Sequence, residues 1–371
     1  MKKIDVGVIG PGSSTVFGMV GQKLLLMLEN HPWFEVAALV AESPDQVGKK
    51  YKDTLQSLTR KWFWEEEMPN KIADMTMLPP DPKDVKKSAD VEFMFSALMP
   101  DISKEIDPQF AKAGYPVISD SGGLRYEEDI PTLVPEINPE HLAIIDSQKK
   151  KRGWEGFVVT GPVCTVTVLA LSMQPVREAF GLKNVFVTTI QALSGAGYTG
   201  VPSMGVTDNM IPFIGGEEEK VEKETAKLFG RVANGKIVSS NVGISSTCTR
   251  IGVLHGHSGC VYAETDKPVT IEEAARTFRT FQAEPQKLEL PSAPKQPVIV
   301  RNETDRPQPR WDRSANANGM GVVVGRIRKE PIFKNGFKYV VVGHNHVRGT
   351  AGNSVLCAEY MYKKGLLKPK R

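Results

Sequence analysis

Short apolar runs alternate with stretches of mixed polarity along the first part of the chain. Runs rich in β-branched and aromatic residues cover 4–9, 34–40, 89–98 and 113–120, and small or polar residues follow each of them. Apolar runs of this length, bounded by turn residues, predict buried strands. The apolar residues at 22–28 predict a helix after the first strand, and further helical stretches separate the others. This order predicts a parallel sheet with helices on both faces.

The second half of the chain is rich in strands. Branched residues at 184–193 and alternating patterns at 319–327 and 337–342 predict an open mixed sheet with helices on one face. A helix is expected at 347–364, with its apolar positions packed back on the first domain. Two segments rich in proline are expected on the outside of the molecule, 51–82 and 291–309.

A glycine-rich loop joins the first strand to the first helix. Gly10, Gly18 and Gly21 allow a tight turn and let a pyrophosphate approach the helix N-terminus, as at the start of a dinucleotide-binding unit. The strict G-x-G-x-x-G spacing is not met, because the loop is several residues longer. A plain strand-to-helix turn is the alternative interpretation.

The end of the second strand normally meets the adenosine ribose of a dinucleotide. Glu42 stands there, and an acidic side chain accepts a hydrogen bond from a free 2′-hydroxyl and repels a 2′-phosphate, which favours NAD. Ser43, Lys49 and Lys50 could instead serve the 2′-phosphate of NADP. The residues leave this choice open.

A cysteine lies between a predicted strand and a predicted helix. Residues 156–175 read GFVVTGPVCTVTVLALSMQP, in which 157–159 predict a strand, Thr160 to Pro162 a turn, and the apolar run after Cys164 a helix. Unpaired N–H groups and the helix dipole at such a position favour the thiolate and can hold an oxyanion, so we expect a lowered pKa and a nucleophile. A small buried core residue is the alternative.

Further candidate groups lie on other loops. Arg125 follows a strand end on a glycine loop, where ligands bind in parallel sheets. A strand is expected to place Arg250, Gly252 and Leu254 on one face, and the following turn to present His255 and His257. Arginine offers a planar fork for a carboxylate or phosphate, and histidine a base that titrates near neutrality. The two histidines also resemble a metal pair, but no further ligand cluster supports one, so no metal is expected.

An acidic cluster begins at Glu217, three residues before Lys220. If a helix begins at Glu217, the two side chains share one face. Most pairs of this kind are solvent-exposed at a helix start.

Length and composition agree with a two-domain globular protein. The 371 residues carry a net charge of +4, without a long charged block, so no nucleic-acid partner is expected. No run of apolar residues is long enough to span a membrane, and residues 1–10 lack the apolar core of a signal peptide, so we expect neither feature. The four cysteines form no CxxC pair, which argues against a zinc ribbon or a disulfide framework and for a cytoplasmic protein.

Several longer motifs are similar to those of the aspartate-semialdehyde dehydrogenases, above all their archaeal and fungal branch. They occur in the family's order and cover nearly the whole chain: GPVCT, IQALSGAGYTGVPS, DNMIPFIGGEEEKVEKET, CTRIGVLHGH, LPSAPKQP, RPQPRWDR and HNHVRGTAGNSV. The resemblance implies a Rossmann-like nucleotide-binding domain and an α/β catalytic domain of the glyceraldehyde-3-phosphate dehydrogenase type with a mixed sheet. We expect the first at 1–160 plus 345–371, and the catalytic and oligomerisation domain at 161–344.

The resemblance also implies an activity. Members reversibly convert L-4-aspartyl phosphate to L-aspartate 4-semialdehyde, usually with NADPH, in the biosynthesis of lysine, threonine and methionine, as homodimers or homotetramers. On this chain, Cys164 resembles the nucleophile that forms a thioester, His257 the general acid/base, and Gln191 the residue that orients the acyl group. The implied substrate contacts are Arg250 for the carboxylate, Glu217 for the amino group, and Lys220 and Arg125 for phosphate. The implied cofactor contacts are Gly10, Gly18, Gly21, Glu42, Ser43, Ser96 and Asn345.

Some positions depart from the family pattern. Val163 replaces the asparagine that commonly precedes the cysteine, and cannot donate a side-chain hydrogen bond to an oxyanion. At the positions of Val163 and His255 the chain resembles the related archaeal malonyl-CoA reductases, whose acyl donor is a CoA thioester. The intact motif GGEEEK instead favours the aspartyl substrate. A CoA-acylating aldehyde dehydrogenase is therefore the alternative function, and a non-catalytic nucleotide-binding relative is a further one.

Overall fold

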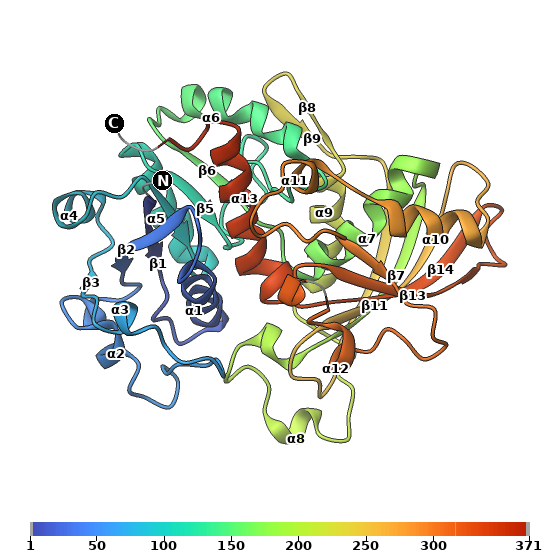
Figure 1. Cartoon of the computed structure of the whole chain (residues 1–371), viewed down its shortest axis with the longest axis horizontal. Coiled ribbons are helices and arrows are strands. Elements are labelled where there is room, and N and C mark those ends of the chain that lie inside the picture. Colours follow the sequence, from blue (N-terminus) through green and yellow to red (C-terminus); the bar gives the residue numbers. More distant parts are fainter. Residues whose placement is uncertain (1–2, 316, 369–371) are drawn as a thin grey trace.

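Two six-stranded sheets organise the chain into two lobes (Figure 1). The structure is a computed structural model that describes residues 3–315 and 317–368. The outermost residues of the expected nucleotide-binding domain, 1–2 and 369–371, therefore lie outside the described residues. Within the described ranges, no helix is long and apolar enough to cross a membrane.

The first sheet is parallel throughout, in the order β3-β2-β1-β4-β5-β6. This is the strand order of a dinucleotide-binding fold, in which ligands bind where the order reverses, here between β1 and β4. The predicted fold class of the first domain is confirmed, and the first two strands have the predicted bounds. The strands are β1 (Ile4–Ile9), β2 (Phe34–Val40), β3 (Met77–Leu78), β4 (Phe93–Ser96), β5 (Pro116–Ser119) and β6 (Phe157–Thr160).

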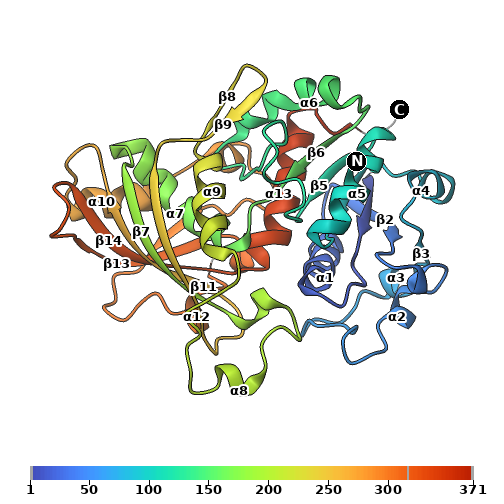
Figure 2. The same ribbon diagram turned by 180° about the vertical axis from the view of Figure 1, so that it is seen from behind.

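Helices cover both faces of this sheet (Figures 1 and 2). The first begins at Val16, earlier than predicted, because the hydroxyl of Thr15 caps it by accepting a hydrogen bond from Phe17 N–H. The proline-rich segment 51–82 lies only partly outside, since Tyr51 is fully buried and β3 joins the sheet edge. The helices of this lobe are α1 (Val16–Leu28), η1 (Pro44–Gln46), α2 (Tyr51–Thr54), α3 (Asn70–Ala73), α4 (Pro82–Ser88), α5 (Pro100–Lys112), η2 (Pro139–Ile144) and α6 (Ile145–Arg152).

The second sheet is mixed, in the order β10-β7-β11-β14-β13-β12, as predicted. Its β10–β7 and β12–β13 pairs are parallel and the others antiparallel. A separate hairpin, β8 (Arg231–Ala233) with β9 (Lys236–Val238), lies against η2 of the first lobe. The strands of the sheet are β7 (Asn184–Gln191), β10 (Gly243–Arg250), β11 (His257–Glu264), β12 (Val298–Val300), β13 (Val322–Lys329) and β14 (Gly336–Gly343).

Helices α7, α9 and α10 lie on one face of the second sheet, and Figure 2 shows them together. The other face carries exposed apolar side chains, among them Phe186 and Tyr262. Burial alternates along β7 for this reason. The helices of this lobe are α7 (Cys164–Phe180), η3 (Leu193–Ala196), α8 (Ser203–Val206), α9 (Glu217–Leu228), α10 (Ile271–Thr280), α11 (Glu284–Lys287), α12 (Pro309–Asp312) and η4 (Ala317–Gly319).

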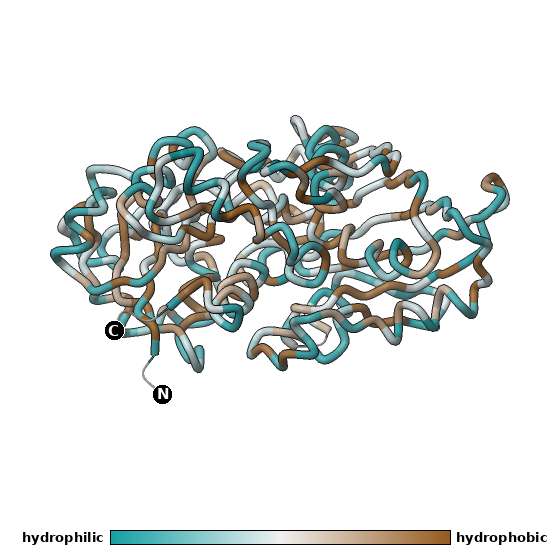
Figure 3. Tube along the Cα trace, turned by 90° about the horizontal axis from the view of Figure 1, so that it is seen from above, coloured by the Kyte–Doolittle hydropathy of each residue, from teal (hydrophilic) through white to brown (hydrophobic). Residues whose placement is uncertain are grey.

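The chain returns to the first lobe at its C-terminal end. A π-helical turn, η5 (Val347–Ala351), continues into α13 (Gly352–Lys363), drawn in red between the lobes in Figure 1. Val355, Leu356 and Met361 belong to the same apolar core as β1 and β2, which confirms the predicted packing. In Figure 3 the apolar segments of both lobes run mainly through the interior. Because η5 packs against α7 and α13 packs in the core of the first lobe, the segment η5–α13 connects the two lobes.

Candidate active site

Cys164 is the first residue of α7, as the sequence predicts. Val163 precedes it in an extended conformation, and the Val163 carbonyl accepts the first hydrogen bond of the helix from Thr167 N–H. Gly349 of η5 lies against the cysteine, since a Cβ there would come within 2.7 Å of the Cβ of Cys164. The candidate nucleophile is thus fixed between the first turn of α7 and the junction of the two lobes.

His257 is the partner of this cysteine. Its Nε2 lies 3.2 Å from Cys164 Sγ, and its Nδ1 accepts a hydrogen bond of 3.1 Å from Ala192 N–H. The prediction that a turn presents His257 is wrong, because His257 is the first residue of β11 and the ladder with β14 holds it. Gly195 passes so close that a Cβ would lie 2.9 Å from the ring.

The protonation of the pair follows from its surroundings. Because Nδ1 accepts a hydrogen bond, the proton of the neutral ring is on Nε2 and points at the sulfur. Burial and the charge of Arg250 lower the pKa of His257 well below its usual value, so the ring is neutral at neutral pH. Burial raises the pKa of Cys164 to about 12, and the negative charge of Glu217 is the second cause of this increase. The predicted lowering of this pKa is wrong for the free protein, since desolvation of the thiolate outweighs the helix dipole.

The raised pKa makes the reactivity of Cys164 strongly pH-dependent. Iodoacetamide reacts with the thiolate, so the alkylation rate of the free protein should rise about tenfold per pH unit between about pH 7 and about pH 9. Mass spectrometry of the peptide containing Cys164 measures this rate, with the same peptide from a Cys164→Ala variant as the control. A rate that levels off below about pH 8 would show that the thiolate forms in the free enzyme, against this expectation.

Glu217 connects the residues around the sulfur. It is the first residue of α9 and is buried. Its Oε1 accepts hydrogen bonds from Thr165 Oγ1 at 2.9 Å and from Gln191 Nε2 at 3.1 Å. Its Oε2 lies 3.7 Å from Lys220 Nζ, so the predicted shared face of this pair is confirmed. The structure thus brings Gln191, Glu217 and Lys220 together on the α9 side of Cys164.

Arg250 completes this group. It ends β10 beside Gln191 in the parallel pair with β7, and it is buried. Its Nη1 donates to Ala192 O at 2.6 Å, and its charge acts on the thiol of Cys164. The predicted strand face with Gly252 and Leu254 is wrong, because β10 ends at Arg250. A guanidinium with further N–H groups therefore lies next to the candidate nucleophile, where an anionic substrate group could bind.

Arg125 lies beneath this site with protein acceptors for all three of its nitrogens. Nε donates to Gly161 O, Nη2 to Asp120 O and Nη1 to Glu224 Oε1, at 2.8, 3.0 and 3.0 Å. The other oxygen of Glu224 accepts a hydrogen bond of 2.7 Å from Val163 N–H. The buried pair therefore holds the loop in front of Cys164. No local pattern in the sequence marks Glu224, because its partners are remote in the chain.

The glycine loop at the end of β1 has the close contacts of a nucleotide-binding turn. Gly10 has φ +86°, and a Cβ there would lie 2.3 Å from Ala97 O. Side chains at Gly18 and Gly21 would collide with the loop backbone, at Ser13 O (2.0 Å) and Pro11 Cα (2.6 Å). The three predicted glycines thus let the loop fold back on α1, although their spacing differs from the usual fingerprint.

The other predicted cofactor residues on this sheet differ in accessibility. Ser96 is buried and donates to Asp107 Oδ1 at 2.7 Å, and Ser119 donates to the second oxygen of Asp107 at 2.7 Å. The hydroxyl of Ser96 therefore already has a hydrogen-bond partner within the protein. Glu42 and Ser43 follow β2 at the outer end of the crevice and are partly exposed, where a ribose could reach them.

Asn345 lies where the two lobes meet. Its Oδ1 accepts from Gly256 N–H and its Nδ2 donates to Ser194 Oγ, both at 2.9 Å. The same hydroxyl lies 2.9 Å from His255 Nδ1. Asn345 therefore positions the loop of η3 that also carries Ala192 and its contacts to the catalytic pair.

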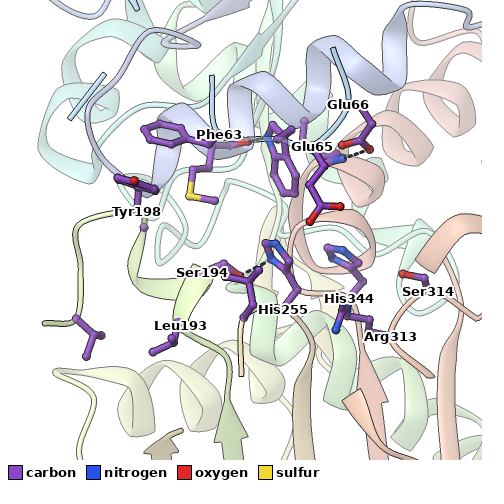
Figure 4. A pocket seen from close by; sticks show the side chains of 16 residues that line it. Phe63, Glu65, Glu66, Leu193, Ser194, Tyr198, His255, Arg313, Ser314 and His344 are labelled. Carbon is purple, nitrogen blue, oxygen red and sulfur yellow. Dashed lines mark hydrogen bonds and ion pairs between the residues drawn. The ribbon is translucent and has the colours of Figure 1, made fainter. Parts of the chain in front are cut away.

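His255 lines a cavity of about 630 Å³ together with Leu193 and Ser194 of the η3 loop. Figure 4 shows Phe63, Tyr198, His344 and Arg313 around it. Burial lowers the pKa of His255 to about 4, so the ring is neutral near neutral pH. Among the residues that the structure describes, no three His, Cys, Asp or Glu side chains gather as a metal site.

The comparisons with known proteins bear on this geometry. One family profile, described as "Semialdehyde dehydrogenase, NAD binding domain", matches residues 5–145, and another, "Semialdehyde dehydrogenase, dimerisation domain", matches residues 173–348. The aspartate-semialdehyde dehydrogenase of Archaeoglobus fulgidus is 47% identical over 98% of this chain and 100% of the relative. The chain belongs to the aspartate-semialdehyde dehydrogenase family. The structure of the Candida albicans aspartate-semialdehyde dehydrogenase with NADP superposes with a TM-score of 0.86 at 34% identity, covering 98% of this chain and 99% of the other.

A relative named for another activity is also similar. The "Malonyl CoA reductase (NADP)" of Metallosphaera sedula is 35% identical over 94% of this chain and 96% of its own length. Identity to the aspartate-semialdehyde dehydrogenases of A. fulgidus and Methanothermobacter thermautotrophicus is higher, at 47% and 44%. The family assignment from the sequence motifs is confirmed.

Proposed function

We propose that this protein is an aspartate-semialdehyde dehydrogenase. It reduces L-4-aspartyl phosphate to L-aspartate 4-semialdehyde and phosphate, reversibly and with NADP as cofactor, in the biosynthesis of lysine, threonine and methionine. The observation that carries the proposal is the contact between Cys164 and His257, with Arg250 and the Glu217–Lys220 pair around it. The identity to the A. fulgidus enzyme over nearly the full chain supports it.

The charges around Cys164 match the groups of an aspartyl substrate. Arg250 offers its remaining N–H groups to the α-carboxylate, and the carboxylate of Glu217 faces the amino group. Lys220 lies 3.7 Å from Glu217 but has a side chain that is 39% exposed, so we propose that it also reaches the phosphate. Arg125 has acceptors within the protein at every nitrogen, so we propose that Lys220 makes the first phosphate contact.

The chemistry begins with the sulfur of Cys164. The thiol loses its proton to water when the thiolate forms, the thiolate attacks the acyl carbon, the C–O bond to phosphate breaks so that phosphate leaves, and a thioester remains. His257 Nε2–H, which donates to the sulfur in the free protein, can donate to the substrate oxygen when that oxygen becomes negative. Gln191, fixed by Glu217, orients the acyl group. A nicotinamide bound in the crevice would supply the hydride that reduces the thioester, and collapse of the thiohemiacetal on Cys164 would then release the aldehyde and the thiolate.

The cofactor is proposed to lie in the crevice between β1 and β4. Gly10, Gly18 and Gly21 shape the loop for the pyrophosphate, and Asn345 is proposed to hold the nicotinamide amide. The fit is supported by the space that each glycine leaves, since a Cβ would close the turn. Ser96 would act through Asp107 at the floor of the crevice.

A second candidate function is CoA-dependent acyl reduction. Its support is Val163, whose apolar side chain precedes the nucleophile, together with the similarity to the M. sedula protein. A malonyl group has no amino group, so the buried Glu217 beside Cys164 would have no substrate partner in that reaction. This residue favours the aspartyl substrate.

Absorbance of the reduced nicotinamide tests the function. Aspartate semialdehyde is offered with phosphate or with CoA, and each is combined with NADP or NAD. We expect turnover that requires phosphate and prefers NADP. Turnover only with CoA, or only with malonyl-CoA and NADPH, would establish the second function. No turnover with any of these substrates, with nucleotide still bound, would indicate a non-catalytic relative.

The family's dimerisation domain forms the second lobe, and we propose a homodimer or a homotetramer as the assembled form. The uncovered sheet face supports this, because Phe186 and Tyr262 expose 51% and 37% of their surface there. A mass in solution of two or four chains is expected. We also propose that residues 1–160 and 345–371 form one domain and residues 161–344 the other. The strands of each sheet fall within one of these two domains.

A further inference from the structure

Glu42 poses a problem for a cofactor with a 2′-phosphate. It follows β2 at the edge of the crevice, where a carboxylate repels that phosphate. Its own surroundings contain an opposing charge: burial raises the pKa of Glu42, while a hydrogen bond from Ser13 and the charge of Arg60 lower it. A cation that sequence analysis did not consider therefore faces the ribose end of the site.

Arg60 is held in place at this end. Its Nη1 pairs with Asp45 Oδ2 at 2.5 Å, and its Nη2 donates to Ser43 Oγ at 3.3 Å. The Ser43 hydroxyl in turn donates to Asp45 Oδ1 at 2.6 Å. The backbone is fixed as well, because Arg60 N–H donates to Ser57 Oγ at 2.9 Å and Arg60 O accepts from Ser57 N–H at 3.0 Å. Asp45 thus anchors Nη1 of the guanidinium, and Nη2 is directed toward Ser43.

The lysines that sequence analysis considered are placed differently. Lys50 Nζ pairs with Asp74 at 3.3 Å, and its side chain is 53% exposed. Lys49 is exposed, and its described hydrogen bonds are made by its backbone. Neither side chain has a described contact with Glu42 or Ser43. Arg60, with a planar fork suited to phosphate, is the cation that the fold brings to the ribose position.

We propose that Arg60 selects NADP over NAD by binding the 2′-phosphate together with the hydroxyl of Ser43, while Asp45 keeps the guanidinium in position. The inference rests on the proposed NADP-dependent function. It explains how a site with Glu42 accepts the additional phosphate, because Arg60, although paired with Asp45, brings a positive charge and N–H donors to the side of Ser43. It also assigns the discrimination to a residue on the segment between α2 and α3, outside the β1–α1 and β2 motifs.

Binding of two nucleotides without any reaction tests the proposal. Isothermal titration calorimetry compares adenosine 2′,5′-bisphosphate with adenosine 5′-monophosphate on the full chain. Arg60→Gln should weaken binding of the bisphosphate about 10- to 100-fold and leave that of the monophosphate unchanged, since only the former places a phosphate at the guanidinium. Arg60→Lys, which keeps the charge and loses the fork, should fall between. Lys50→Gln is the matched control and should bind both nucleotides like the unaltered protein.

Each remaining outcome decides against the proposal. Equal loss for both nucleotides in Arg60→Gln would indicate a general disturbance, and no loss, or a loss in Lys50→Gln instead, would assign the phosphate elsewhere. In all these cases the unaltered protein still prefers the bisphosphate, so the NADP-dependent function stands. An unaltered protein that binds both nucleotides equally would instead contradict the NADP assignment, and with it the role of Arg60.

Discussion

Replacing Cys164 by alanine should lower the turnover number by a factor on the order of 10⁴ or more, because no other group in the site can form the thioester. Cys164 Sγ faces His257 Nε2 at 3.2 Å, whereas the other three cysteines belong to β10, β11 and α13. The assay is phosphate-dependent reduction of NADP by aspartate semialdehyde. Nucleotide affinity should stay unchanged, since the crevice between β1 and β4 is not altered.

Cys260→Ala is the matched control for this prediction. Cys260 is partly exposed on β11, and burial raises its pKa, so its thiol is protonated near neutral pH. The control should keep the parental turnover number. Phosphate-dependent turnover that survives in Cys164→Ala would remove the thioester mechanism and the role of this cysteine.

Glu136→Ala should lower the free energy of unfolding by about 3–5 kcal/mol, the cost of leaving one partner of a buried ion pair alone. Glu136 and Arg348 form two parallel hydrogen bonds of 2.9 and 2.8 Å, and neither side chain is exposed. The pair joins the segment before η2 to η5, which supports Gly349 and Cys164. Chemical denaturation followed by circular dichroism measures the change.

An exposed ion pair provides the contrast. Glu128 and Lys236 are 2.8 Å apart, but both side chains are more than half exposed. Water screens such a pair, so Glu128→Ala should unfold at the parental denaturant concentration. An equal loss of unfolding free energy in both variants would show that burial does not determine how much the Glu136–Arg348 pair contributes to stability.

Local patterns were sufficient for much of the fold. The apolar runs at β1 and β2 gave the bounds of both strands, because a buried parallel strand is apolar on both faces and turn residues end it. The start of α7 at Cys164 followed from a turn before a long apolar run, and α9 begins at Glu217, the start that the shared face of Glu217 and Lys220 required. The end of β10 was missed, because its apolar pattern continues past Arg250 while its partner β7 ends at Gln191.

The sequence by itself determined the two-domain α/β architecture, the family, and the identity of Cys164, His257, Arg250 and Glu217 as candidate residues. These depend on neighbouring residues and on motifs read along the chain. Only the tertiary structure decided the raised pKa of Cys164, since that depends on burial and on Glu217 from another helix. The hydrogen bonds of Arg125 with its acceptors and of Arg60 with Ser43 likewise depend on the tertiary structure, because they connect segments that are distant in the sequence. The physical reason is that desolvation and ion pairing act through space, so their strength is fixed only when the chain has folded.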